Sequence, residues 1–220
     1  MKLLIKFPTR NRVNKFLKVL EVYIKNLDDK STEIIVSCDF DDVTMNQDYV
    51  RKVIEQYQNV KLFYGNNKTK IEAINANLED VDFDIILLAS DDMIPIVKGF
   101  DTIIKTKMIE HYPDTDGVLW FNDGHQGNKL NTLCILGKKY YDRFGYIYYP
   151  KYHSVWSDNE FMDVANLLGK QIYFEDVIIQ HQHPDYGFGE RDIVHVLNNN
   201  NGGHDENLYH TRKQKNFELW

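Results

Sequence analysis

Short apolar runs alternate with segments of helical periodicity through the first part of the chain, as far as Pro95. The apolar runs predict strands at 3–7, 33–38, 60–64 and 84–89, and the helical spacing predicts helices at 13–27, 46–58 and 69–78. The last run is almost wholly apolar, which indicates a central strand covered on both faces. Strands and helices that alternate in this way form right-handed crossovers, so the pattern predicts a mostly parallel sheet.

Beyond Pro95 the pattern becomes mixed. It predicts helices at 96–112, 138–144 and 158–168, and strands at 117–121, 131–136, 171–174 and 177–180. The segment after Pro184 is rich in Asn, Gly and His, which predicts a loop at 198–203 before a terminal helix. No internal repeat or strong linker divides the chain, so we expect one α/β domain with a C-terminal appendage.

Composition narrows the class of protein. Hydrophobic residues make up 43% of the 220 residues, enough to fill a sizeable core, and the net charge of −7 argues against a general phosphate-backbone binder. The two cysteines, Cys38 and Cys134, are too few for a disulfide framework, which fits a reducing compartment. The first apolar run is too short for a signal peptide, and no run is long enough to span a bilayer. We therefore expect a soluble, cytoplasmic protein.

Charged residues follow three of the predicted strands. Arg10 and Arg12 come after the first strand, Asp39 closes the second, and Asp91 and Asp92 follow the fourth. Ligands bind beyond the carboxyl ends of the strands in open parallel sheets. The sequence therefore predicts a ligand site at this edge of the sheet.

Three acidic or histidine motifs are candidates for chemistry. Adjacent carboxylates such as Asp91 and Asp92 are costly unless a positive group such as Mg²⁺ or Mn²⁺ compensates them, although a solvated turn with a helix cap is the alternative. His181 and His183 point the same way if the chain is extended, as metal ligands or as an inert surface pair. Asp158 lies at the start of a predicted helix, where it is either a reactive carboxylate or the cap of that helix.

The order of these motifs resembles the GT-A glycosyltransferases, particularly the family-2-like ones, over residues 3–185. The segments that carry the resemblance are Phe7-Pro8-Thr9-Arg10-Asn11-Arg12, Ile34-Ile35-Val36-Ser37-Cys38-Asp39, Lys70-Ile71-Glu72-Ala73-Ile74-Asn75-Ala76-Asn77, Ile86-Leu87-Leu88-Ala89-Ser90-Asp91-Asp92-Met93-Ile94-Pro95, Ser157-Asp158-Asn159-Glu160-Phe161 and His181-Gln182-His183-Pro184. The resemblance implies an α/β three-layer sandwich, Rossmann-like, with a mostly parallel central sheet and helices on both faces. It implies one domain at 1–185, with a nucleotide-binding half at about 1–95 and an acceptor-binding half at about 96–185. Residues 186–220 would then form a C-terminal loop and helix, as a lid or an appendage.

The resemblance also implies roles for individual residues. The nucleotide-sugar donor would contact Pro8, Thr9, Arg10, Arg12, Asp39, Lys70 or Asn75, Ser90 and Asp92. Asp91 would bind Mn²⁺ or Mg²⁺ together with His181 or His183, and Asp158 would be the general base of an inverting reaction. The first Asp of the family's Asp-x-Asp motif falls on Ala89, so one ribose or metal contact is missing or comes from Ser90 or Asp92.

The expected function is therefore the transfer of a sugar from a nucleotide diphosphate sugar, most commonly a UDP-sugar, to an acceptor hydroxyl. The usual acceptors are saccharides, lipid-linked sugars and proteins, and the negative net charge weakens the case for a modified DNA base. Residues 122–125 and 148–153 are candidates for acceptor contacts, with a turn and core packing as their alternatives. A nucleotidyltransferase should carry a glycine-rich loop after the first strand, and residues 8–12 contain no glycine. A non-catalytic sugar- or nucleotide-binding module stays open because of Ala89.

Overall fold

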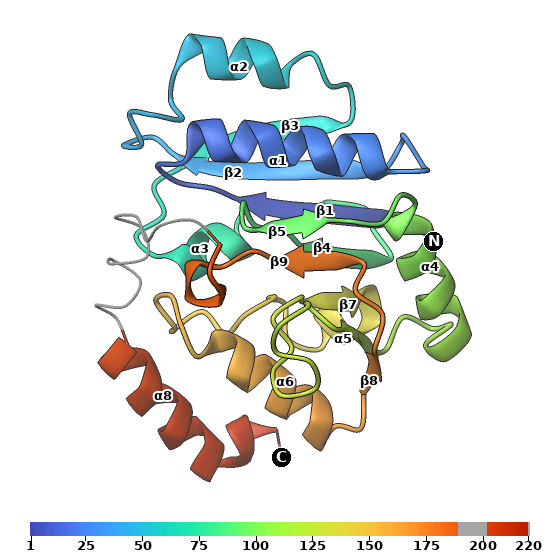
Figure 1. Ribbon diagram of the computed structural model, residues 1–220. Helices are drawn as coiled ribbons and strands as arrows, with labels where there is room; N and C mark the ends of the chain where they lie inside the picture. Colours follow the sequence, from blue (N-terminus) through green and yellow to red (C-terminus); the bar gives the residue numbers. More distant parts are fainter. Residues whose placement is uncertain (189–201, 220) are drawn as a thin grey trace.

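The computed structural model describes residues 1–188 and 202–219, and its centre is a seven-stranded sheet (Figure 1). The strand order is β3-β2-β1-β4-β7-β6-β8. All neighbouring strands are parallel except β7, which pairs antiparallel with β4 and β6. The strands are β1 (Leu3–Pro8), β2 (Glu33–Asp39), β3 (Val60–Gly65), β4 (Ile85–Leu88), β6 (Val118–Phe121), β7 (Ile135–Gly137) and β8 (Gln171–Phe174).

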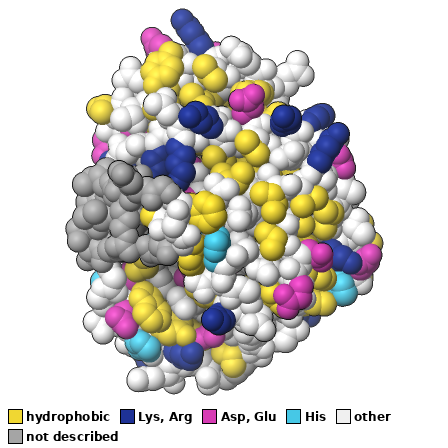
Figure 2. Space-filling model, viewed as in Figure 1, with side chains coloured by type: hydrophobic (Ala, Val, Ile, Leu, Met, Phe, Trp, Pro, Cys, Tyr) yellow, Lys and Arg dark blue, Asp and Glu magenta, His cyan; other side chains and the backbone are white. Residues whose placement is uncertain are grey.

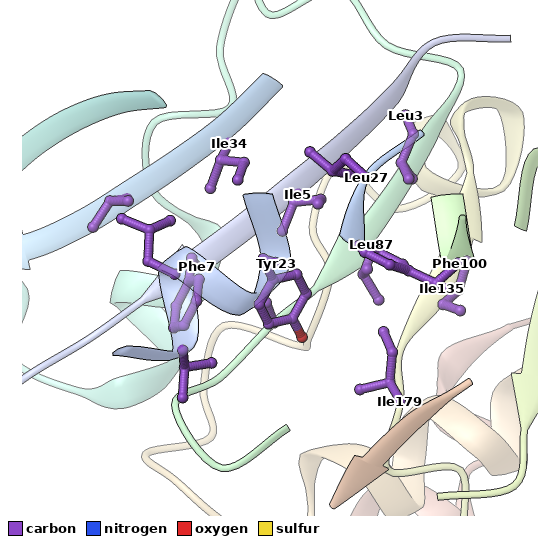
Figure 3. Packing of buried hydrophobic residues seen from close by; sticks show 14 of the residues in the cluster. Leu3, Ile5, Phe7, Tyr23, Leu27, Ile34, Leu87, Phe100, Ile135 and Ile179 are labelled. Carbon is purple, nitrogen blue, oxygen red and sulfur yellow. The ribbon is translucent and has the colours of Figure 1, made fainter. Parts of the chain in front are cut away.

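Helices cover both faces of this sheet, which confirms the predicted three-layer α/β sandwich. One face carries α1 (Val13–Asn26), α2 (Asp48–Ile54) and α4 (Phe100–His111). The other carries α3 (Lys70–Asn75), α5 (Lys138–Asp142), α6 (Ser157–Leu167) and α8 (Gly202–Gln214). The alternation of side chains along a strand explains the two layers, since Ile5 and Phe7 enter one core and Leu4 the other. Figure 3 shows Tyr23 of α1 in the first core, where its ring lies 5.6 Å from that of Phe7.

A small antiparallel sheet of β5 (Met93–Pro95) and β9 (Ile179–His181) was not expected from the pattern. The sequence predicted a helix from residue 96, but Gly99 adopts a left-handed conformation (φ 75°) and α4 begins after it. In the ladder, Met93 pairs with His181, so the chain just after Asp92 lies beside a segment about ninety positions further along. This sheet therefore decides which late residues reach the carboxyl end of β4.

Several predicted element boundaries were wrong. The helices expected at 46–58 and 69–78 are shorter, and the strand expected at 131–136 begins only at Ile135. Gly202 and Gly203, expected in a loop, begin α8, and the rest of that predicted loop (198–201) lies outside the described residues. Periodicity marks the residues that face the core, but it fixes the ends of an element only to within a few residues.

The surface facing the viewer in Figure 1 is mixed in character. Figure 2 shows hydrophobic side chains interspersed with charged and polar ones across this face. Within residues 1–188 and 202–219, no helix combines the length and the apolar composition needed to cross a membrane.

A buried lysine lies in the layer between β1 and α3. Lys6 is fully buried, and its Nζ donates to the Ser37 hydroxyl and, at 2.7 Å, to the carbonyl of Ala76 just after α3. Ser37 in turn donates to Asn77 at 2.7 Å. Burial lowers the pKa of Lys6 to about 7, because charge is costly away from water. This network ties the end of α3 to the central strands.

The Lys6 pKa predicts a pH-dependent stability. Between about pH 7 and the ordinary lysine pKa, Lys6 is protonated in the unfolded chain and neutral in the folded chain. The free energy of unfolding therefore increases as the pH rises through that range. We expect the free energy of unfolding of the wild type, measured with urea, to increase between pH 7.5 and pH 9.5 by on the order of 2 kcal/mol more than that of Lys6→Met. A constant difference between the two proteins would mean that Lys6 keeps its proton.

Candidate active site

A cleft of about 860 Å³ opens at the carboxyl ends of β1, β2 and β4. Its volume lies within the range of small-molecule sites. The predicted site residues that line it are Pro8, Thr9, Arg10, Arg12, Asp39, Lys70, Ser90, Asp91, Asp92, Asp158, His181 and His183. Asn75 does not line the cleft, because its side chain bonds the backbone of residues 147 and 148. The fold thus gathers residues from six separate sequence motifs into one cavity.

The two adjacent carboxylates sit at the centre of this cleft, both buried. Asp91 Oδ1 lies 2.8 Å from Arg12 Nη1 and 3.6 Å from Lys15 Nζ. Burial raises the pKa of Asp91, and Arg12 opposes that rise. Burial would do the same to Asp92, but His181 and the Ser90 hydroxyl stabilise its charged form and hold its pKa well below the usual value. Each carboxylate therefore has a cationic side chain nearby.

His181 lies between two carboxylates. Its Nε2 is 3.8 Å from Asp92 Oδ2, and its Nδ1 is 3.5 Å from Asp123 Oδ2. Asp123 is fixed by the Thr132 hydroxyl at 2.7 Å and by the backbone N–H groups of His125 and Gln126. Burial lowers the pKa of His181, but the two carboxylates outweigh it and raise the pKa to about 9. Of the two alternatives for residues 122–125, the turn is present: Asn122 accepts the N–H of Gly124 and Asp123 accepts that of His125. Asp123 also has a contact with His181 that the sequence did not indicate.

These residues fit a divalent cation. The Nε2 of His181 faces Asp92 at 3.8 Å, while its buried Nδ1 faces the carboxylate of Asp123 at 3.5 Å. Carboxylate oxygens together with an imidazole suit Mn²⁺, and a carboxylate behind a ligating histidine commonly orients its ring. Asp91, Asp92, His181 and His183 all line the same cavity. We take these four residues as the candidate ligands for a metal ion in this cleft.

Among residues 1–188 and 202–219, the three ligands whose atoms already lie within 4.8 Å of one another are different ones: His153, His204 and Asp205. The two imidazole rings are parallel to within 2°, with their centroids 4.1 Å apart. Nitrogen lone pairs lie in the ring planes, so parallel rings direct them into planes that do not meet. The carboxylate of Asp205 already accepts three backbone N–H groups. This group does not fit a metal ion.

Asp158 is the second residue of α6 and lines the cleft. The helix cap is Trp156, so the alternative of Asp158 as the cap is wrong. Burial raises the pKa of Asp158, and Lys70, the Asn159 N–H and His181 only partly offset this. A carboxylate with a raised pKa in a partly enclosed cleft is suited to accept a proton.

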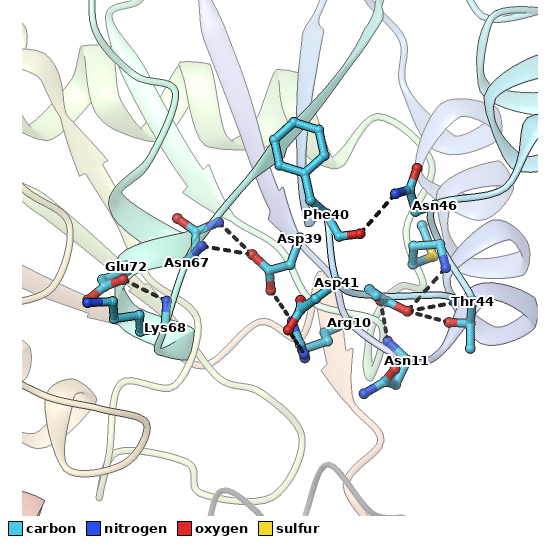
Figure 4. Close-up of polar contacts among 12 residues, drawn as sticks. Arg10, Asn11, Asp39, Phe40, Asp41, Thr44, Asn46, Asn67, Lys68 and Glu72 are labelled. Atoms are coloured by element: carbon cyan, nitrogen blue, oxygen red, sulfur yellow. Dashed lines mark hydrogen bonds and ion pairs between the residues drawn. The ribbon is translucent and has the colours of Figure 1, made fainter.

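Polar contacts join the loops that follow β1, β2 and β3 at one end of the cleft (Figure 4). Arg10 donates to Asp39 at 2.7 Å and forms two bonds with Asp41, at 2.7 and 3.0 Å. The other oxygen of Asp39 accepts from the backbone and side chain of Asn67. Asn11 takes the left-handed conformation (φ 58°), with its N–H bonded to Asp42. Cleft residues that the sequence did not single out include Asn66, Asn67, Lys68 and Thr132, and none belongs to a motif with recognisable chemistry.

This arrangement, a parallel sheet with acidic residues after β2 and β4 and a helix-borne carboxylate opposite, is the GT-A fold. No family model matches the sequence, and no curated protein matches it by sequence. Solved structures do match. The mannosyltransferase PcManGT from Pyrobaculum calidifontis, in complex with GDP-Man and Mn²⁺, aligns with a TM-score of 0.68 at 14% identity, over 85% of this chain and 58% of that chain.

Two further solved structures share the fold. TarS 1-349 from S. aureus, in complex with UDP-GlcNAc, has a TM-score of 0.63 at 19% identity, over 81% of this chain and 57% of that chain. The 4-diphosphocytidyl-2C-methyl-D-erythritol synthase from Anaerococcus prevotii DSM 20548 has a TM-score of 0.53 at 11% identity, over 84% of this chain and 92% of that chain. The chain thus spans less than two thirds of the length of PcManGT and of TarS 1-349. At these identities the likeness establishes the fold alone.

The position of His181 predicts a metal-affinity effect. Titration of the protein with MnCl₂ by calorimetry should show at least about 10-fold weaker binding in His181→Ala, because the variant loses the imidazole that faces Asp92. His183→Ala, measured in parallel, tests the second histidine of the pair. His111→Ala, on α4 and outside the cleft, is the control. Unchanged Mn²⁺ affinity in His181→Ala would remove that residue from the set of metal ligands.

Proposed function

We propose that the protein is a metal-dependent glycosyltransferase that moves a sugar from a nucleotide diphosphate sugar to an acceptor hydroxyl, with inversion at the anomeric carbon. A UDP-sugar is the donor that we propose in the first place. The observation that carries the proposal is the shared cleft. Asp158, from the start of α6, faces the same cavity as Asp91, Asp92 and His181. A metal-binding group and a separate carboxylate base are the two parts that such a reaction needs.

The solved neighbours support this choice of reaction. The structure of PcManGT contains GDP-Man and Mn²⁺, and one TarS structure contains UDP-GlcNAc. Both proteins have this fold, and in this chain the carboxyl edge of the sheet carries the acidic cleft. The donor class and the metal are carried over to this chain as part of the proposal.

Charge on the leaving diphosphate has partners in the cleft. Arg10, Arg12 and Lys70 all line the cleft. Arginine binds phosphate oxygens through its planar pair of N–H groups, and in this cleft Arg12 now pairs with Asp91. Asp91 with His181 or His183 would hold the cation, which would supply further positive charge beside the leaving diphosphate.

The oxygen of the acceptor hydroxyl forms a bond to the anomeric carbon while the bond from that carbon to the diphosphate breaks. Asp158 accepts the proton that the hydroxyl loses. The raised pKa of Asp158 improves it as a base. Positive charge develops on the ring in a transition state with oxocarbenium character, and nearby carboxylates stabilise it. Tyr148, His153 and Trp156 line the wall beside Asp158, which is where we place the acceptor, a saccharide, a lipid-linked sugar or a protein side chain.

A nucleotidyltransferase is the second candidate. The synthase from Anaerococcus prevotii makes a diphosphocytidyl compound by its name, and the match covers 92% of that chain. The loop at residues 8–12 carries two arginines but no glycine to wrap a triphosphate closely. A non-catalytic binding module is the third candidate, kept open by Ala89, which lines the cleft where the family's first motif acid would stand.

One binding measurement separates these functions. Melting temperatures are recorded with a panel of nucleoside diphosphates, nucleotide sugars and nucleoside triphosphates, each with Mn²⁺ and with EDTA. At a concentration 100 times Kd, a cognate donor should stabilise the protein by about 2.7 kcal/mol, a shift of about 5 °C or more that disappears with EDTA and in Asp91→Asn. A shift only with a triphosphate would favour the nucleotidyltransferase.

Asp158→Asn tests the proposed base. The variant should bind the donor as the wild type does, while turnover falls by about 10²-fold or more, because asparagine cannot accept the proton. Donor hydrolysis by water can be followed before the acceptor is known. Asp163→Asn, on the same helix but outside the cleft, is the matched control. Turnover near that of the wild type would remove Asp158 from the mechanism.

A further inference from the structure

The wall of the cleft that carries Asp158 is one continuous stretch of chain. Residues 153–158 all line the cavity, and the first four lie outside any helix or strand. Trp156 within this stretch has a left-handed backbone (φ 63°), which is unfavourable for a large side chain without local compensation. Something must therefore hold this segment in a conformation that it would not adopt alone.

The carboxylate of Asp205, on α8, supplies that restraint. Its Oδ1 accepts the N–H of His153 at 2.9 Å, and its Oδ2 accepts those of Ser154 and Val155 at 2.9 and 3.0 Å. The side chain is fully buried, and His204 Nδ1 lies 2.9 Å from its Oδ1. Bonds from backbone N–H groups to a buried carboxylate are among the stronger hydrogen bonds in proteins. Three consecutive amides just before the strained residue are thus fixed by one side chain.

The rest of α8 is firmly attached to the same region. Arg212 pairs with buried Glu160 of α6 at 2.9 Å, and Glu160 also accepts from Tyr152 at 2.8 Å. The ring of Tyr209 packs against Trp156, with centroids 5.0 Å apart. Figure 1 shows α8 lying alongside α6. Asp205 therefore acts from a helix that is itself anchored to the helix carrying Asp158.

We propose that Asp205 is a positioning residue for the transfer reaction: its carboxylate fixes the backbone of residues 153–155 and thereby keeps Asp158 facing the cleft. Asp205 does not line the cleft, so it acts through the segment and not on the substrate. The inference rests on the proposed function, because it assigns the C-terminal helix a part in placing the proposed base. No bond of the donor or acceptor is made or broken at Asp205.

The test compares Asp205→Asn with Tyr209→Phe. Asparagine has a single acceptor oxygen, so the variant cannot accept from all three amides. Tyr209→Phe leaves those amides alone and removes the bond that the Tyr209 hydroxyl donates to Asp163 on α6 and the one that it accepts from Lys213. Hydrogen exchange of the amides at 153–155 should be faster in Asp205→Asn and unchanged in Tyr209→Phe. Asp205→Glu, which keeps the charge but displaces the carboxylate, is the second variant if Asp205→Asn does not fold.

The kinetic measurement uses hydrolysis of the donor identified in the melting panel. Asp205→Asn should lower kcat by about 10-fold or more while KM for the donor stays within about threefold, because the proposed donor contacts come from the loops after β1, β2 and β4 and not from residues 153–155. Tyr209→Phe should leave both within about twofold. Faster exchange at 153–155 with an unchanged kcat would overturn the proposal and leave the proposed function standing. Absence of turnover by the wild type with every donor would overturn the proposed function and this inference with it.

Discussion

Buried carboxylates at the open end of a parallel sheet are the constraint on which the rest of the site depends. Asp91 and Asp92 lie where β4 ends, both removed from water, and like charges so placed destabilise each other unless positive groups approach. The chain meets this demand with Arg12 from the loop after β1 and His181 from β9. Segments distant in sequence are thus drawn to one point by electrostatics, and that point is where a cation would bind.

The small sheet of β5 and β9 turns this attraction into a defined geometry. Its ladder sets His181 opposite Met93, and the N–H of Gln182 donates to the carbonyl of Asp92 at 2.6 Å. The backbone N–H of His181 bonds the carbonyl of Asp123, so the histidine and the carboxylate behind it belong to one hydrogen-bonded unit. Backbone pairing fixes the imidazole more tightly than side-chain contacts alone would. A site assembled in this way is already organised before a ligand arrives.

The opposite wall is organised by different means. That wall is not part of a sheet, and Trp156 within it has a positive φ. The buried ion pair between Glu160 of α6 and Arg212 of α8 holds the C-terminal helix against it. Buried ion pairs contribute little net stability compared with apolar packing, but removing one partner is costly, so they favour one arrangement over others. The two walls of the cleft therefore differ in character: strand pairing fixes the wall that carries His181, and contacts with α8 fix the wall that carries Asp158.

The sequence by itself determined the class of fold, because alternating apolar strands and amphipathic helices leave few ways to bury their faces. It also placed Asp39, Asp91 and Asp92 at the carboxyl ends of strands, since that position follows from strand boundaries alone. Only the tertiary structure shows that Asn75 bonds the backbone of residues 147 and 148 and that Asp123 contacts His181. It also shows that Asp205 bonds the backbone of the segment that leads to Asp158. These roles depend on contacts between residues far apart along the chain, and local periodicity carries no record of such contacts.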